Sequence, residues 1–410
     1  MPRLWLILAD DLTGAADCAI AFARQGMEPV VTWGKVTTSG ATSVLSVNVD
    51  SRNLPGGKAA ERQVAAQAAH WRPGVQLYKK IDSTLRGQPA AELAAQLSAL
   101  AADGGRAPLA VVAPAFPAAG RVTLDGRVEV GGLRLEDTPL WTRDHTYANA
   151  ALPDVLASAG LTAEVIPLDL VRAGSEAVHA RMEDAWRRGV AAVVCDCVAE
   201  ADLGVTAAAS LLLTAAVWVG SAGLAGALAA LVAPARLMRP VLPARPGGVL
   251  TVVGSLAEIS RLQARMLVES GLVQHVLVTH ETLLAGPQSP GWRATRDSLS
   301  EGLLAGRDIL LEIAVVPEPD LRRGPEVLAG LAALVAPVAK SLGALVATGG
   351  ETACALLSGF DIQGIRVLDE VEPGVPLGVT LGALSFPVVT KAGGFGDPDT
   401  LRRCLARLGN

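Results

Sequence analysis

The chain has 410 residues and a formal net charge of −5, and at roughly 150 residues per domain this length favours two or three domains. Half of the residues are hydrophobic and only 3% are aromatic, which is typical of alanine-rich helices packed on strands rich in valine and leucine. The acidic balance, without any long run of lysine or arginine, argues against nucleic acid as a partner.

Short apolar runs alternate with helix-forming stretches from the first residues onward, and this alternation predicts parallel sheets with crossover helices. The predicted strands are, in chain order, Leu4–Ala9, Val44–Val49, Leu109–Ala113, Ala191–Cys195, Val249–Val253, Ile309–Val315 and Ala344–Ala347. We therefore expect an α/β protein of two domains, each a mostly parallel sheet flanked by helices, with a cleft between them.

The apolar run Leu4–Ala9 is too short for a secretory signal, so we interpret it as a first strand. The five cysteines show neither C-x-x-C nor metal-ligand spacing, and their odd number favours a reducing, cytoplasmic location. A homodimer is compatible with the sequence, which gives no evidence for or against one.

The segment between Asp202 and Arg236 contains 33 residues without one charge, which is long enough to consider a membrane span. Its centre favours a different interpretation: Ala215–Val219 is typical of a strand, Gly220–Gly223 of a turn and Leu224–Val232 of a helix. We therefore expect a buried strand, turn and helix here, and no membrane partner.

Four prolines between Pro234 and Pro246 oppose regular helix and favour an extended connector. We expect one domain over residues 1–235, a connector over residues 236–248 and a second domain over residues 249–410. A loop-rich region, Asp125–Asn149, is either an excursion over a site or a β-hairpin, and the sequence assigns it no role.

Two adjacent carboxylates, Asp10 and Asp11, follow the first predicted strand and precede Thr13 and Gly14. Open α/β sheets bind ligands at the carboxyl ends of their strands, and the following helix directs its first amides to the same place. A helix cap needs only one aspartate, so we favour a functional role for the pair over simple capping.

A second cluster follows the run that starts at Val75 and combines cations, a carboxylate and hydroxyls. Its candidate ligand-binding residues are Lys80, Ile81, Asp82, Ser83 and Arg86, with Arg52 as a further candidate clamp for an anion. Lysine and arginine pair with carboxylates or phosphates, and an aspartate accepts hydrogen bonds from sugar hydroxyls. An ordinary solvated turn explains the cluster equally well when it is taken alone.

Three glycine-rich turns lie in the second half of the chain, two of them directly after predicted strands. Glycine lets backbone amides approach a phosphate closely, so the three turns together favour a nucleotide site. Its candidate residues are Ser255, Thr348, Gly349, Gly350, Glu351, Thr352, Gly393 and Gly394.

Several common motifs are missing from the sequence. Without G-x-x-x-x-G-K-[ST] a P-loop kinase is excluded, and neither H-E-x-x-H nor G-x-S-x-G occurs. The run Gly220–Gly226 differs in glycine spacing from the dinucleotide fingerprint and has no acidic residue about 20 positions later. It is more typical of close packing between a helix and a strand.

Six segments together resemble the four-carbon acid sugar kinase family, and they occur in the family's order along nearly the whole chain. They are Ala9–Ala15, Lys80–Gly87, Ala113–Arg121, Gly220–Ala225, Thr348–Thr352 and Lys391–Gly396. The segments Asp50–Arg52 and Trp141–Ala150 match the family pattern less closely, so the resemblance does not identify the acid.

The resemblance implies that residues 1–235 bind the sugar acid and residues 249–410 bind ATP. It implies phosphate transfer to the terminal (4-) hydroxyl of D-threonate, D-erythronate or a 3-oxo-tetronate. It also implies that the aspartate pair, Arg52 and Lys80–Ser83 line the sugar-acid site, whereas Ser255, the 348–352 turn and Gly393-Gly394 line the ATP site.

For the mechanism, we expect Asp11 or Asp10 to accept the proton of the attacking hydroxyl, with Asp82 less favoured, and Mg²⁺ to bridge the ATP phosphates without an assigned protein ligand. Lys80, Arg52 and Arg86 are expected to hold the carboxylate of the acid. Two other functions stay open: an NAD(P)-dependent oxidoreductase of a small hydroxy acid, and a non-catalytic sugar-acid-binding relative.

Overall fold

The computed structural model describes residues 4–33, 42–102, 106–141, 146–232, 242–243, 247–316 and 320–409. The chain divides into two compact units. The first comprises the described residues of Met1–Pro29 and Ser39–Leu237, and the second those of Val30–Thr38 and Met238–Asn410. Most of the proline-rich segment that we predicted as a connector lies outside the described residues.

The first unit is built on a parallel sheet with the strand order β3-β1-β4-β11-β5-β10-β9. Its strands are β1 (Leu4–Ala9), β3 (Val44–Asn48), β4 (Val75–Lys80), β5 (Leu109–Ala113), β9 (Ala163–Ile166), β10 (Ala192–Cys195) and β11 (Ala216–Gly220). A small antiparallel sheet joins β6 (Arg121–Leu124), β7 (Arg127–Val130) and β8 (Leu133–Arg134).

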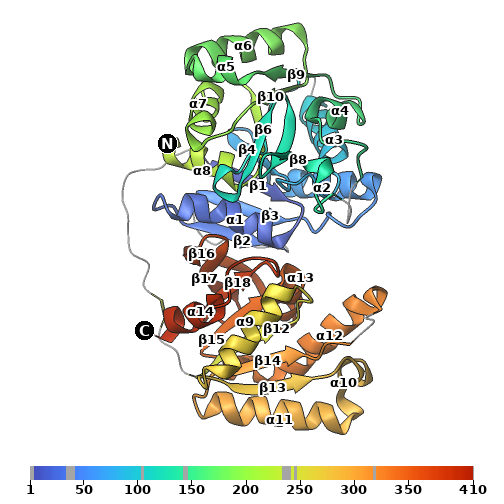
Figure 1. The fold of residues 1–410 in the computed structure, drawn as a ribbon, viewed down its shortest axis with the longest axis vertical. Coiled ribbons are helices and arrows are strands. Elements are labelled where there is room, and N and C mark those ends of the chain that lie inside the picture. Colours follow the sequence, from blue (N-terminus) through green and yellow to red (C-terminus); the bar gives the residue numbers. More distant parts are fainter. Residues whose placement is uncertain are drawn as a thin grey trace. The chain divides into compact units, whose positions relative to one another are not determined.

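Helices cover both faces of this sheet (Figure 1). They are α1 (Leu12–Ala23), α2 (Gly56–His70), α3 (Pro89–Ala101), α4 (Leu152–Ala157), α5 (Leu168–Arg172), α6 (Ser175–Arg188), α7 (Glu200–Ser210) and α8 (Ala222–Val232), with short 3₁₀ helices at Pro117–Ala119 and Leu135–Asp137.

Two cores follow from the alternation of side chains along each buried strand. On β1, Trp5 and Ile7 face the core formed with α1 and α5–α8, whereas Leu6 and Leu8 face the core formed with α3 and α4. Because both faces are covered, the strand sequences are almost continuously apolar.

The uncharged segment forms a strand, a turn and a helix within the fold, as predicted. Within it, β11 ends at Gly220 and α8 begins at Ala222, and the side chains of Trp218 and Leu224 are buried. Across the described residues, no helix combines the length and hydrophobicity that a membrane crossing requires.

The second unit has a sheet with the strand order β13-β14-β12-β15-β18-β17-β16-β2. In this order the first five strands, β13-β14-β12-β15-β18, are parallel to their neighbours, whereas the pairs β18-β17, β17-β16 and β16-β2 are antiparallel. The strands are β2 (Pro29–Thr32), β12 (Val249–Val253), β13 (Gln274–Val278), β14 (Ile309–Ile313), β15 (Ala344–Thr348), β16 (Ile362–Glu372), β17 (Val375–Gly382) and β18 (Pro387–Lys391).

Six helices of this unit lie among the described residues, and α9 and α14 share a core with β12, β15 and β18. The helices are α9 (Glu258–Glu269), α10 (His280–Ala285), α11 (Pro290–Leu304), α12 (Gly324–Val335), α13 (Gly350–Gly359) and α14 (Thr400–Gly409), with 3₁₀ helices at Gly286–Gln288, Leu321–Arg323 and Ala336–Ser341.

The structure confirms the α/β class and the predicted strands to within a residue or two at their ends. Of the loop-rich region Asp125–Asn149, β7 and β8 form antiparallel pairs, so the hairpin interpretation holds for its first part, while residues 142–145 lie outside the described chain. The sequence did not predict β2, β9, β13, β18 or the antiparallel strands β16 and β17.

Candidate active site

Three polar segments of the first unit meet because β3, β1 and β4 are neighbours with parallel directions. Their carboxyl ends therefore lie at one edge of the sheet, where ligands bind in open α/β folds. Asp10 and Asp11 follow β1, Asp50–Arg52 follow β3, and Ile81–Arg86 follow β4. The structure thus brings together all the residues predicted for the sugar-acid site.

Arg52 links these segments through its guanidinium. Its Nε and Nη2 donate to the two carboxylate oxygens of Asp10 at 2.7 and 2.9 Å, and its Nη1 donates to Asp11 Oδ2 at 2.5 Å. Its Nη2 also lies 3.6 Å from Asp82 Oδ2. In this structure the guanidinium of Arg52 therefore contacts all three aspartates, and these contacts orient their carboxylates.

The two adjacent aspartates differ in exposure and hydrogen bonding. The side chain of Asp10 is 3% exposed and that of Asp11 is 28% exposed. Asp11 Oδ1 also accepts from the Gly14 amide at 2.8 Å and caps α1, so the capping role considered from the sequence belongs to Asp11. Of the two aspartates, Asp11 both caps α1 and keeps its carboxylate accessible to solvent, whereas Asp10 does neither.

Their surroundings move the two pKa values in opposite directions. Burial tends to raise the pKa of Asp10, but the charges of Arg52 and Lys80 outweigh burial and lower it. For Asp11, burial and the negative charge of Asp10 prevail over Arg52 and raise the pKa. Asp11 is therefore the more basic carboxylate of the pair.

Asp82 organises the loop that follows β4. Its Oδ1 accepts hydrogen bonds from the amide and hydroxyl of Thr84, and its Oδ2 accepts from Arg86 Nη2 at 2.7 Å. Burial tends to raise the pKa of Asp82, but the charges of Arg52 and Arg86 outweigh burial and hold this pKa far below its usual range. The loop also places Leu85 at a φ of 61°, an uncommon conformation for a branched residue.

Lys80 is a buried cation whose side chain approaches Gly14. Its Nζ donates to the Ile81 carbonyl at 2.8 Å, and the residue is 5% exposed. Among the described residues no carboxylate lies within 4.0 Å of this ammonium. A Cβ at position 14 would lie 2.8 Å from Lys80 Nζ, which explains the glycine there. Ile81 contributes its carbonyl, since its side chain packs in the core.

A buried polar network lies behind the site and was not predicted from the sequence. Lys79 Nζ and Glu92 Oε2 are 2.6 Å apart, with side chains 0% and 1% exposed. Glu92 Oε1 accepts from Ser51 Oγ at 2.5 Å, and Ser51 also accepts from Gln63 at 3.2 Å. Glu92 was inconspicuous in the sequence because it stands alone in an alanine-rich helix.

Two further residues lie near the site, and neither of them was assigned a role from the sequence. Arg121 Nη1 donates to Ser83 Oγ at 2.6 Å. Asp17 lies one turn along α1 from Thr13 and Gly14, and burial, opposed by Lys80 but supported by Asp11, raises its pKa to about 7. Its Oδ1 is buried and makes no hydrogen bond within the described chain.

In the second unit, the three predicted glycine turns also converge. They follow β12, β15 and β18, which are neighbouring parallel strands. A Cβ on Gly393 would lie 2.1 Å from Ser255 Oγ, and one on Gly254 would lie 2.7 Å from Thr352 Oγ1. The turns therefore contact one another, and they do so at positions where a larger residue does not fit.

Lys391 shapes the last of these turns from inside. It is 2% exposed, and its Nζ donates to the carbonyls of Ala392 and Phe395 at 2.9 and 3.0 Å. Ser260 Oγ donates to the Gly393 carbonyl at 2.7 Å. With these carbonyls turned inward, the amides of Gly393 and Gly394 have no acceptor among the described residues and are available to an anion.

The middle turn leads into α13, whose first turn contains Glu351 and Thr352. Gly349 has a φ of 93°, and its amide donates to the Lys391 carbonyl at 2.7 Å. Thr348 is fully buried and donates to the Val252 carbonyl, whereas Glu351 is exposed. The Thr348 side chain thus stabilises the fold. The first amides of α13 lie where the three turns meet.

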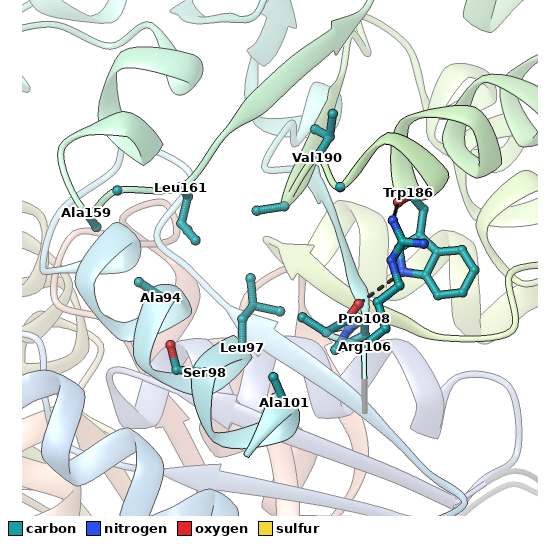
Figure 2. A pocket seen from close by; sticks show the side chains of 14 residues that line it. Ala94, Leu97, Ser98, Ala101, Arg106, Pro108, Ala159, Leu161, Trp186 and Val190 are labelled. Carbon is teal, nitrogen blue, oxygen red and sulfur yellow. Dashed lines mark hydrogen bonds between the residues drawn. The ribbon is translucent and has the colours of Figure 1, made fainter. Parts of the chain in front are cut away.

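A pocket of about 370 Å³ lies in the first unit at the amino ends of β5 and β10, the opposite edge of the sheet from Asp10, Asp11 and Arg52 (Figure 2). Its wall includes Leu97 and Ser98 of α3, Leu161, and Trp186 of α6. It contains none of the predicted site residues. Within the described chain, no group of three or more histidine, cysteine or acidic side chains has the arrangement of a metal site.

Comparisons with known proteins match the two halves of the chain to two different domain models. A model of a sugar-binding N-terminal domain matches residues 5–228, and a model of a nucleotide-binding C-terminal domain matches residues 250–401. A curated D-threonate kinase from Cupriavidus necator is 44% identical over 97% of this chain and 96% of its own length. A D-erythronate kinase from Heliobacterium modesticaldum is 29% identical over 98% and 96% of the two chains.

A solved structure from Salmonella typhimurium has the same fold, with a TM-score of 0.84, 22% identity, and coverage of 98% of this chain and 99% of its own. Two domain models together match most of the chain, and a relative is 44% identical over nearly the full length. The chain therefore belongs to the four-carbon acid sugar kinase family.

Proposed function

We propose that this protein is an ATP-dependent kinase that phosphorylates the terminal hydroxyl of a four-carbon sugar acid, with D-threonate as its preferred substrate. The observation that carries this proposal is the 44% identity to a D-threonate kinase over 97% of the chain. The geometry supports it independently, because a sheet edge with aspartates and a buried ammonium suits a hydroxy acid, and convergent glycine turns suit a nucleotide.

For the nucleotide, the amides of Gly393 and Gly394 and the start of α13 would bind phosphate oxygens, because these donors lack other acceptors and the helix dipole favours an anion. Ser255 and Thr352 contact the same place and would complete the site, together with Thr348–Glu351 through the backbone. Mg²⁺ bound to the phosphates would supply charge neutralisation during transfer.

Asp11 is the proposed proton acceptor. As the acceptor hydroxyl attacks the γ-phosphorus, its proton passes to the Asp11 carboxylate, the bond to the ADP oxygen breaks, and a phosphate ester and ADP result. Asp11 fits this role better than Asp10 or Asp82 because its pKa is raised and its side chain is accessible. Asp10 and Arg52 would hold it in place.

Lys80 would supply positive charge for the carboxylate of the acid, because this ammonium has no carboxylate partner in the described chain. Ser83 would donate or accept at a substrate hydroxyl. Arg86 would act indirectly by fixing Asp82, to which it is bonded at 2.7 Å. The same holds for Arg52, which the sequence suggested as a direct clamp.

The direct test is ADP release by the purified protein with D-threonate, D-erythronate and 3-oxo-tetronate, with the phosphate located on the product by NMR. We expect the highest kcat/KM for D-threonate and a phosphate on the terminal oxygen. If none of the three acids causes ADP release, the kinase proposal is refuted. Acid-dependent reduction of NAD(P)⁺, seen as a rise in absorbance at 340 nm, would establish the oxidoreductase instead.

Asp11→Asn tests the proton acceptor separately. Asparagine caps a helix as well as aspartate does, so α1 should keep its start, while loss of a general base should lower kcat by about 10²- to 10⁴-fold. The KM for ATP should not change. Asp137→Asn, at an exposed position of the same unit, is the control. Near-normal turnover by Asp11→Asn would remove Asp11 from this role.

A further inference from the structure

The cations at the carboxyl edge of the first sheet fall into two groups. Arg52 and Arg86 are bonded to aspartates, and Lys79 is paired with Glu92. Lys80 and Arg121 differ, because within the described residues neither has a carboxylate within 4.0 Å. A cation without a counter-charge, held at a ligand-binding edge, is suited to bind an anionic group of the ligand.

Arg121 is held in place by hydrogen bonds of its own backbone. Its carbonyl accepts from the Phe116 amide at 2.8 Å, and its amide donates to the Phe116 carbonyl at 3.2 Å. Two residues further along β6, Thr123 exchanges two hydrogen bonds of 2.9 Å with Cys197, just beyond the end of β10. The small sheet is thereby fastened to the large one, which fixes the position from which Arg121 reaches the site.

The side chain of Arg121 then spans from β6 to the loop after β4. Nη1 donates to Ser83 Oγ at 2.6 Å, and this is the one hydrogen bond of its guanidinium within the described chain. A guanidinium carries five N–H donors in a planar fork that matches a carboxylate. Most of the donors of Arg121 are therefore available beside Ser83, three residues after Lys80.

We propose that Arg121 binds the carboxylate of the sugar acid together with Lys80, and that it makes the site select acids over neutral sugar alcohols. This inference rests on the proposed function. The opposite end of the ligand, with its terminal hydroxyl, then lies toward Asp11. A planar fork and an ammonium together satisfy both oxygens of a carboxylate, whereas an uncharged CH₂OH group would leave two cations without a counter-charge.

The experiment compares wild type with Arg121→Met, Arg121→Lys and the control Arg134→Met, which removes an exposed arginine of β8 in the same small sheet. For each protein, kcat/KM is measured with D-threonate, and the corresponding four-carbon sugar alcohol is measured as a substrate or as a competitive inhibitor. Binding of D-threonate is measured in parallel by calorimetry.

Loss of a charge-assisted hydrogen bond predicts a 10- to 100-fold higher KM for the acid in Arg121→Met. The KM for ATP and the constants for the sugar alcohol should stay within about threefold, so selectivity for the acid falls by the same factor. Arg121→Lys should recover part of the selectivity because it keeps the charge, and Arg134→Met should behave as wild type.

Equal losses for the acid and the sugar alcohol in Arg121→Met would overturn the inference, because they would show that Arg121 only anchors the Ser83 loop. Unchanged affinity for the acid would overturn it as well. The calorimetry separates this inference from the kinase proposal: wild-type protein that releases no ADP but binds the acid, with weaker binding in Arg121→Met, would refute the activity and support Arg121.

Discussion

Glu92→Gln removes one charge of the ion pair behind the sugar-acid site while keeping the shape of the side chain. The pair is fully buried, with Lys79 0% and Glu92 1% exposed and 2.6 Å between the charged atoms. The variant leaves the Lys79 ammonium without its counter-ion in the interior. The same change weakens the acceptor of the Ser51 hydroxyl, which precedes Arg52.

Breaking a buried ion pair on one side costs about 3–5 kcal/mol, because an uncompensated charge remains in the interior. We expect the free energy of unfolding of the first unit to fall by this amount in Glu92→Gln. Replacing both partners, as Lys79→Met with Glu92→Leu, should recover most of the loss, since hydrophobic replacement of a whole pair is often neutral or stabilising.

The assay is urea unfolding of the full-length protein, followed by tryptophan fluorescence. Buried Trp5 and Trp218 report on the first unit, and Glu61→Gln, at an exposed position of α2, is the matched control. A decrease of less than about 1 kcal/mol in the free energy of unfolding of Glu92→Gln would refute the reasoning, because it would show that the ion pair behaves as if it were exposed. A double variant as unstable as the single one would refute it as well.

Two further predictions concern the nucleotide turns. Gly393→Ala would place a Cβ 2.1 Å from Ser255 Oγ, so the KM for ATP should rise at least tenfold while the KM for the acid changes little. The control is Gly324→Ala, because a Cβ there meets only open space. An unchanged KM for ATP in Gly393→Ala would contradict the proposed site. Burial lowers the pKa of Lys391 to about 8, so between pH 8 and 10.5 the unfolded chain holds a proton that the native chain has released. Urea unfolding should show the stability of wild type rising with pH over this range relative to Lys391→Met, and parallel pH profiles of the two proteins would contradict the lowered pKa.

The sequence predicted those parts of the fold that depend on local patterns. Buried parallel strands are continuous apolar runs, and Leu109–Ala113 and Val249–Val253 were placed to the residue. The carboxyl ends of such strands gather at one edge, so the aspartate pair and the Lys80–Arg86 loop could be assigned to a single site before their distances were known.

Partners that lie far apart in the chain could not be predicted in this way. The sequence does not show that Arg52 is bonded to three aspartates or that Lys391 bonds inward to carbonyls, because both depend on side-chain contacts between separate segments. Arg121 and Glu92 were missed for the same reason. Each stands in an unremarkable local context and acquires its role from residues 38 and 41 positions away, Ser83 and Ser51.

The strand β2 has a consequence for how the chain can be divided. It lies before residue 33 in the sequence, yet it pairs antiparallel with β16 of the second unit, with Val31 opposite Ile365 and both buried. A fragment that starts at the proline-rich segment therefore lacks one strand of its own sheet. Such a fragment would expose the unpaired edge of β16 and tend to aggregate or recruit a strand from elsewhere, so gene fusions and truncations should keep β2 in the same chain as the second unit.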